Sequence, residues 1–253
     1  MTTTIVIPMA GRGSRFADAG YTTPKPLIPI HGRPMIQVVI DNIRPSTPHR
    51  FVFICQAEAV GEYGLRDQLQ EWAPGSALVE LNGVTEGAAC TVLEADAHID
   101  RDQPLMIANS DQYVDIAIDD YLAEMDRRDL DGLIMTMDAD DPKWSFAALD
   151  DQDLVTRVVE KQPISRHATV GIYNYRRGGD FIDGAREMIA RDLRVNGEFY
   201  VAPVYDQMIA RGARVGVFGV GAEADGMYGL GIPADLDRFA ALEVSRRAVE
   251  GLD

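Results

Sequence analysis

Apolar, β-branched runs alternate with amphipathic segments through the first half of the chain, and this alternation limits the fold more than any other feature. The run at 5–7 predicts a strand buried on both faces. Pro34 suits the first turn of a helix, and the apolar residues that follow it fall on one helical face. The alternation continues with strands expected at 50–56, 76–81 and 104–109 and helices at 62–72 and 87–99. It predicts an α/β fold with a doubly wound, mostly parallel, Rossmann-like sheet flanked by helices, and ligands at the carboxyl ends of the strands.

The pattern changes from about residue 131. Short strands are expected at 132–137, 146–149, 154–161 and 168–175, before helices return at 179–192 and 203–211. This succession predicts a smaller, partly antiparallel layer that covers the strand ends. The segment 232–250 predicts a packing helix that begins near Pro233.

Charge and composition exclude several classes of protein. The net charge of −16 argues against a nucleic-acid-binding surface, which needs an extended field of lysine and arginine. The start of the sequence lacks a basic segment followed by a long apolar one, and no run of about 20 apolar residues occurs, so we expect no membrane partner and a cytoplasmic location. The two cysteines, Cys55 and Cys90, indicate neither a disulfide framework nor a metal site, and both are expected to be small core residues.

The stretch "AGRGSRF" at 10–16 follows the first predicted strand directly. Gly11 and Gly13 allow the chain to approach a ligand closely, so that successive N–H groups can converge on a phosphate. The loop is not a Walker A sequence, and it lacks the third glycine of the dinucleotide fingerprint. A glycine turn with solvated arginines remains the alternative for these residues alone.

A lysine between two prolines strengthens the phosphate interpretation. Pro24 and Pro26 restrict the backbone on both sides of Lys25, which limits where its ammonium group can go. This restriction lowers the ordering cost when the lysine meets a phosphate. A lysine that served only solubility would gain nothing from it.

Together, "AGRGSRF" and "PKPLIPIHGRPMI" resemble the signature of the nucleotidyltransferases that join a nucleoside triphosphate to a sugar phosphate or a related phosphorylated alcohol, releasing pyrophosphate. The resemblance implies a nucleotidyltransferase fold of the GT-A type and one catalytic domain over 1–253. Its nucleotide-binding half would cover about 1–130, and its acceptor-binding half about 131–253. The triphosphate would lie over residues 10–15, and Arg15 and Lys25 would act on the phosphates around the reacting α-phosphorus. The nucleotide-binding residues would include Ala10, Gly11, Gly13 and Ser14.

Later segments supply the remaining candidate residues. Asp111 follows an apolar strand at the ligand-binding edge, where a carboxylate can hold Mg²⁺, and "NSD" resembles the family's magnesium motif. Glu86 and Gly87 resemble the family's segment near the nucleobase, although a helix start without a functional role is the alternative. The segment "VVEKQPISRHATVGIYNY" resembles the acceptor-binding part of the family, with Gln162 interrupting the match. By this resemblance the acceptor-binding residues are Glu160, Lys161, Gly171 and, from "NGEFYVAP", Glu198.

One departure concerns the second metal ligand. The family usually supplies an aspartate near the end of the domain, and Gly229 in "YGLGIPADL" stands at its place. Asp225, four residues earlier, is a substitute by hypothesis.

The expected activity is therefore Mg²⁺-dependent transfer of a nucleotide to a phosphorylated acceptor. A glycosyltransferase of similar architecture and a non-catalytic nucleotide-binding protein remain alternatives. The first would release no pyrophosphate, and the second would bind nucleotide without turnover. The nucleobase, the acceptor and the pathway stay open, and a homodimer is expected only because it is the commonest assembly.

Overall fold

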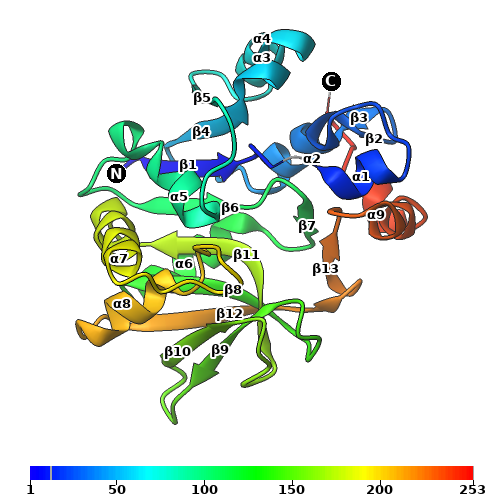
Figure 1. Ribbon diagram of the computed structural model, residues 1–253. Coiled ribbons are helices and arrows are strands. Elements are labelled where there is room, and N and C mark those ends of the chain that lie inside the picture. Colours follow the sequence, from blue (N-terminus) through cyan, green and yellow to red (C-terminus); the bar gives the residue numbers. More distant parts are fainter. Residues whose placement is uncertain (12, 253) are drawn as a thin grey trace.

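Four parallel strands form the first half of the central sheet. The computed structural model describes residues 1–11 and 13–252. These strands are β1 (Thr3–Pro8), β4 (His49–Gln56), β5 (Ala77–Leu81) and β6 (Leu105–Ala108), and they lie in the order β5-β4-β1-β6 (Figure 1). The chain moves outward from β1 to β5 and then returns to the other side of β1 with β6. The loops after β1 and β6 therefore face the same crevice, where doubly wound sheets bind ligands.

The strands of the second half continue the same sheet. They are β7 (Gln112–Val114), β8 (Gly132–Asp138), β9 (Ser145–Leu149), β10 (Val155–Glu160), β11 (His167–Tyr175), β12 (Val215–Glu223) and β13 (Gly226–Gly229). The order continues from β6 as β11-β8-β12-β13-β7, with β11 antiparallel to both β6 and β8. The antiparallel pair β9–β10 leaves this path and joins it at β11. The predicted, mostly parallel sheet and the smaller, partly antiparallel portion are thus both present, and hydrogen bonds join them into one sheet.

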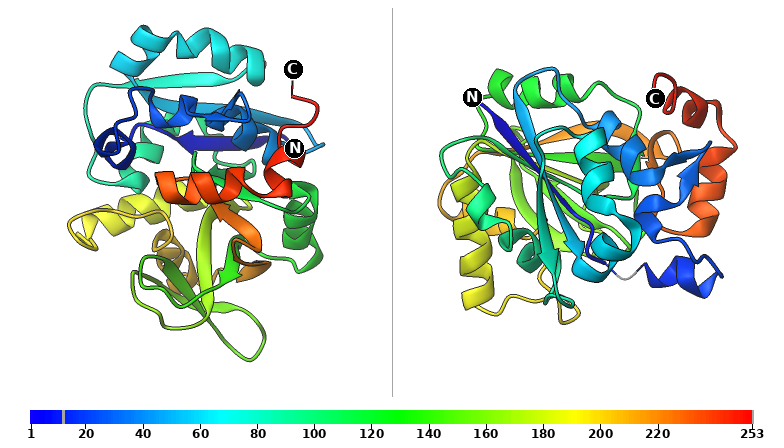
Figure 2. Two further views of the ribbon diagram at one scale, coloured as in Figure 1. Left: turned by 90° about the vertical axis from the view of Figure 1, so that its right-hand side faces the viewer. Right: turned by 90° about the horizontal axis from the view of Figure 1, so that it is seen from above.

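Helices cover both faces of the sheet, as the doubly wound prediction requires. Their bounds are α1 (Ser14–Asp18), α2 (Met35–Asn42), α3 (Ala57–Tyr63), α4 (Leu65–Trp72), α5 (Ala88–Leu93), α6 (Ile118–Arg127), α7 (Gly178–Ala190), α8 (Val204–Ala210), α9 (Pro233–Ala240) and α10 (Glu243–Arg247). One hydrophobic core lies between Ile5 and Ile7 of β1 and helices α2, α4 and α6. The other lies between Val6 and helices α5, α7 and α8. Figure 2 shows α6 (green) and α7 (yellow) on opposite sides of the sheet.

A third, smaller core joins the two ends of the chain. The 3₁₀ turn Lys25–Leu27 leads into the short pair β2 (Pro29–Ile30) and β3 (Arg33–Pro34). Phe16 of α1 and Ile28 next to β2 pack in one cluster with Leu236 and Phe239 of α9. The glycine-containing loop is therefore supported by elements from the C-terminal end of the chain.

Three predicted helices are shorter or broken. The helix expected at 62–72 is two helices, because Gly64 between them has a φ of 61°. The helix expected at 87–99 ends at Leu93, and a 3₁₀ turn (Asp96–His98) follows it. The segment from Pro233 forms two helices, α9 and α10, in place of one. The helix expected near Pro34 is α2, which begins at Met35 with Pro34 as its N-cap.

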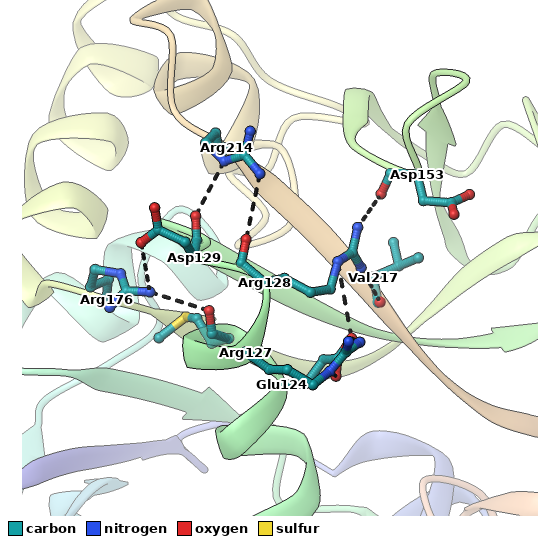
Figure 3. A network of polar contacts seen from close by, with 9 residues as sticks. Glu124, Arg127, Arg128, Asp129, Asp153, Arg176, Arg214 and Val217 are labelled. Carbon is teal, nitrogen blue, oxygen red and sulfur yellow. Dashed lines mark hydrogen bonds and ion pairs between the residues drawn. The ribbon is translucent and has the colours of Figure 1, made fainter.

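Several arginines lie at the end of α6, on the side of the sheet away from the loops that follow β1 and β6 (Figure 3). Arg176 donates hydrogen bonds to the carbonyl oxygens of Met125 (3.2 Å) and Leu130 (2.6 Å). Arg214 donates to the carbonyl of Asp129 at 3.2 Å. Carbonyl groups at a helix end lack partners within the helix, so these side chains stabilise the turn from α6 into β8.

Candidate active site

The predicted lysine and the predicted metal-binding aspartate meet at the carboxyl edge of the sheet. Lys25 begins the 3₁₀ turn after Pro24, and Asp111 lies three residues beyond the end of β6. The Nζ of Lys25 lies 2.8 Å from Oδ2 of Asp111, with 20% and 26% of the two side chains exposed. The two residues are 86 positions apart in the sequence, and the fold brings them into contact.

The glycine-containing loop is shaped around this lysine. Gly13 caps α1 with a φ of 61°, and a Cβ at its position would lie 3.3 Å from the Cβ of Lys25. Ala10 is buried, and its carbonyl accepts a hydrogen bond from Nε2 of Gln56 at 2.7 Å. A side chain at position 13 would be strained and crowded against Lys25, so glycine is strongly favoured there. Residue 12 of the predicted loop lies outside the described residues.

Two small cavities flank the Lys25–Asp111 pair. We call the first the loop cavity; it measures about 210 Å³ and is lined by Gly13, Ser14, Arg15, Lys25, Asp111 and Gly231. The second, the strand-edge cavity, measures about 230 Å³ and is lined by Pro8, Met9, Gly11, Lys25, Pro26, Asn109, Ser110 and Asp111. Every described residue of the predicted phosphate segment except the buried Ala10 therefore borders one of them.

A third cavity is lined by three of the four predicted acceptor residues. This β11 cavity measures about 380 Å³, and its lining includes Arg15, Glu160, Lys161, Gly171 and Tyr200. Arg15 lines both this cavity and the loop cavity, and Asn109 lines both this cavity and the strand-edge cavity. The predicted phosphate and acceptor regions are therefore contiguous.

Glu160 supplies a buried carboxylate to the β11 cavity. Only 8% of the residue is exposed, and it accepts a hydrogen bond from the Ser145 hydroxyl. Burial raises the pKa of Glu160 above its usual value, and the hydrogen bond offsets this rise only in part. A carboxylate in this position can accept hydrogen bonds from the hydroxyl groups of a ligand.

Lys161 reaches the same cavity from a strained backbone position. Its φ is 56°, and its ammonium donates to the Tyr200 hydroxyl at 2.7 Å. This hydrogen bond raises the pKa of Lys161, so the side chain is a cation at neutral pH. Glu198, the fourth predicted acceptor residue, is exposed and pairs through its backbone with Val195.

Gly171 has a conformation that only glycine adopts readily. Its φ is 83° at an irregularity in the pairing of β11 with β8. A Cβ there would lie 2.1 Å from Nδ2 of Asn109, which is far closer than real contacts allow. The glycine therefore makes room for the Asn109 side chain.

The two residues expected near the nucleobase have structural partners. Gly87 has a φ of 132°, and a Cβ on it would lie 2.5 Å from the backbone of Phe199. The exposed Glu86 forms an ion pair with Arg194. Close approach of the two halves of the chain accounts for Gly87, and contact with a base stays a prediction for both residues.

In the segment that lacks the family's aspartate, the residue next to Asp111 is Gly231, and Gly229 lies elsewhere. A Cβ on Gly231 would lie 2.7 Å from Oδ2 of Asp111, whereas a Cβ on Gly229 would lie 3.5 Å from Oδ2 of Asp235. Asp225 is exposed in the turn between β12 and β13 and is not among the described residues that line the loop cavity. Nothing in this geometry supports Asp225 as a ligand, and its assignment stays a hypothesis.

The donor set suits a metal ion that arrives with phosphates. Among the described residues, no group of three or more His, Cys, Asp or Glu side chains could hold a metal. Mg²⁺ is usually held by one or two carboxylates together with substrate phosphates and water. A single carboxylate, that of Asp111, is sufficient for this pattern.

All three lysines of the chain lie in these cavities. The sequence contains lysine only at positions 25, 143 and 161, and the other cations are arginines or histidines. Lys143 lines the β11 cavity and pairs with Glu223 at 2.8 Å. The sequence analysis did not identify four residues that line the cavities: Lys143, Asn109, Tyr200 and Gly231. The scarcity of lysine in the sequence is a signal for Lys143 alone.

Within residues 1–11 and 13–252, no helix is both long and apolar enough to cross a membrane.

Known proteins have a similar fold. The chain superposes on the nucleoside-diphosphate-sugar pyrophosphorylase from Vibrio cholerae RC9 with a TM-score of 0.81 and 26% identity, over 94% of this chain and 100% of the other. The inositol-1-phosphate CTP transferase from T. maritima gives a TM-score of 0.73 at 14% identity, over 99% and 97% of the two chains, which is a likeness of fold alone.

Comparisons of sequence agree with these structural comparisons. The bifunctional protein GlmU of Methanococcus aeolicus is 24% identical over 175 residues, which cover 67% of this chain but only 39% of that longer protein. The sequence model described as nucleotidyl transferase matches residues 5–186. Since this match covers well over half of the 253 residues, the protein belongs to the nucleotidyl transferase family.

Proposed function

We propose that the protein transfers a nucleotide from a nucleoside triphosphate to a sugar 1-phosphate, or a similar phosphorylated small molecule, and releases pyrophosphate. The observation that carries the proposal is the position of Arg15, which lines both the loop cavity and the β11 cavity. One guanidinium group is thereby available to two phosphorylated ligands in adjoining cavities. The likeness to a nucleoside-diphosphate-sugar pyrophosphorylase supports the same reaction.

The proposed reaction is a direct displacement. A phosphate oxygen of the acceptor forms a bond to the α-phosphorus, and the bond from that phosphorus to the bridging oxygen of pyrophosphate breaks, with the electron pair leaving on pyrophosphate. A phosphate monoester has a second pKa of about 6, so it is already anionic at neutral pH and needs no protein base. Catalysis then depends on positioning and on neutralising charge.

The described cations can perform that neutralisation. Lys25 and Arg15 would hold the triphosphate in the loop cavity, and Lys161 would hold the acceptor phosphate in the β11 cavity. A phosphate at Lys25 would compete with the 2.8 Å contact to Asp111 and would thereby make the carboxylate available. Asp111 would then hold Mg²⁺, which supplies further neutralisation of the phosphate charges when bound.

The β11 cavity favours a hydroxylated acceptor. Glu160 offers a buried carboxylate as a hydrogen-bond acceptor, and Trp144 and Tyr200 offer aromatic surface beside it. A sugar ring presents both hydroxyl groups and apolar C–H groups, so it matches this lining. Which sugar and which nucleobase are used stays open.

The decisive experiment measures pyrophosphate release with Mg²⁺, each common nucleoside triphosphate and a panel of sugar 1-phosphates together with phosphocholine. We expect release that requires one base and one acceptor. Lys25→Ala should lower kcat by about 10²- to 10³-fold, the usual effect of deleting one preorganised charged group. Wild-type turnover in Lys25→Ala at saturating substrates would remove this lysine from the mechanism.

The two alternatives give different results in the same assay. A glycosyltransferase would consume a nucleotide sugar without releasing pyrophosphate. A regulatory protein, which Gly229 at the place of the metal-binding aspartate favours, would bind a triphosphate without turnover. Either result would overturn the proposed function.

A further inference from the structure

Asn109 lies where two of the cavities meet. It follows β6 directly, two residues before Asp111, and it lines both the strand-edge cavity and the β11 cavity. Its backbone N–H donates to the carbonyl of Gly171 at 3.0 Å, which fixes the main chain at this point. The side chain therefore stands between the regions proposed to hold the triphosphate and the acceptor.

The neighbouring strand is built to accommodate this side chain. A Cβ on Gly171 would lie 2.1 Å from Nδ2 of Asn109 and 2.8 Å from Oε1 of Gln112. Gly171 also has a φ of 83°, so the irregular strand leaves space that the amide occupies. A larger residue at position 171 would displace Asn109.

The amide has capacity to bind a ligand. Asn109 is exposed, and its side chain has no hydrogen-bond partner among the described residues. A side-chain amide provides two N–H donors without adding charge. Both donors can therefore exchange water for a ligand that enters either cavity.

We propose, resting on the proposed function, that Asn109 is a catalytic residue whose amide donates hydrogen bonds to a non-bridging oxygen of the α-phosphate. The P–O bond to the acceptor forms and the bond to pyrophosphate breaks while Asn109 transfers no proton. Its contribution is to hold the α-phosphate in line and to stabilise charge that develops on its oxygens.

The test is a double-mutant cycle read by pyrophosphate release. Asn109→Ala should lower kcat by about 10²-fold with little change in KM, because a donor that acts in the transition state affects turnover. Asn109→Asp should lose at least as much, since it places a negative charge beside phosphate. Gly171→Ala should also lower kcat, and in the Asn109→Ala background its further effect should nearly vanish because the two act through one group.

The control is Gly219→Ala in β12, where nothing lies within 4 Å of the added Cβ. It should leave kcat unchanged, and thermal unfolding should show that each variant is folded. Wild-type kcat in Asn109→Ala would overturn the proposal, as would effects of Asn109→Ala and Gly171→Ala that simply multiply.

A binding measurement separates this proposal from the proposed function. If the wild type releases no pyrophosphate with any substrate pair, calorimetry with UDP-glucose, CDP-glucose and GDP-mannose decides. Binding weakened about 10-fold by Asn109→Ala would support the contact, because hydrogen bonds to charged groups contribute on that scale. Equal binding would overturn it, and absence of binding by the wild type would overturn both proposals.

Discussion

At the scale of single residues, the site combines cations with one buried carboxylate. The ammonium of Lys25 pairs with Asp111. Among the described residues, the ammonium of Lys161 has the neutral Tyr200 hydroxyl as its one hydrogen-bond acceptor. Glu160 lies nearby, and its burial makes the ionised form of its carboxyl group unfavourable. Groups that are expensive to bury and are retained at a cavity are typical of binding sites.

Glu160 provides a pH-dependent prediction. Its folded-state pKa lies above the unfolded value of about 4.5, so ionised Glu160 destabilises the fold at neutral pH, and stability is regained as pH falls through the folded pKa. Glu160→Gln should therefore raise Tm at pH 7 to 8, and this gain should disappear below about pH 4. Thermal unfolding of both proteins across this range measures it. The same variant should raise KM for the acceptor, and a Tm gain that does not depend on pH would contradict the argument.

At the scale of elements, a single glycine divides one of the predicted helices. The apolar spacing of 62–72 predicts one helix, yet α3 and α4 are separate because Gly64 adopts a left-handed conformation. Helical periodicity reports which face is buried and contains little information about such breaks. At the other end of a helix, Asp119 and Asp120 lie in the first turn of α6, where negative charge interacts favourably with the helix dipole.

A pair of glycine variants tests this break. Gly64→Ala should destabilise the protein by about 1 kcal/mol, because alanine is strained at a φ of 61°. Gly61→Ala, three residues earlier within α3 and with open space around its Cβ, should stabilise it by about 0.5 to 1 kcal/mol. Urea unfolding gives both values. Equal effects of the two substitutions would show that the break at Gly64 does not persist in solution.

At the scale of the whole molecule, one sheet connects all parts of the site. Strand β6 carries Asn109 and Asp111 beyond its end, its neighbour β11 carries Gly171, and the loop after β1 carries Gly11 and Gly13. The C-terminal segment returns through β13 and places Gly231 against Asp111. The site is thus assembled from residues far apart in sequence.

The scarcity of lysine allows a test across the whole chain. Acylation of amines at alkaline pH should abolish pyrophosphate release, because the three lysines at 25, 143 and 161 all line the cavities. A nucleoside triphosphate with Mg²⁺ should protect Lys25, and the acceptor should protect Lys161, whose hydrogen bond to Tyr200 raises its pKa and slows its reaction. Peptide mass spectrometry identifies the modified positions, with the N-terminal amine as an unprotected control. Full activity after modification of all three lysines would contradict the assignment.

The sequence by itself determined the layered fold and the local pattern of the loop predicted to bind phosphate. The alternation of buried strands and one-sided helices depends on local periodicity, and the spacing of Gly11, Gly13, Arg15 and Lys25 is a local pattern. The meeting of Lys25 with Asp111, the space that Gly171 leaves for Asn109 and the approach of Gly231 were decided only by the tertiary structure. Each is a contact between segments whose separation in sequence bears no relation to their distance in space, because the order of strands in the sheet sets which loops adjoin.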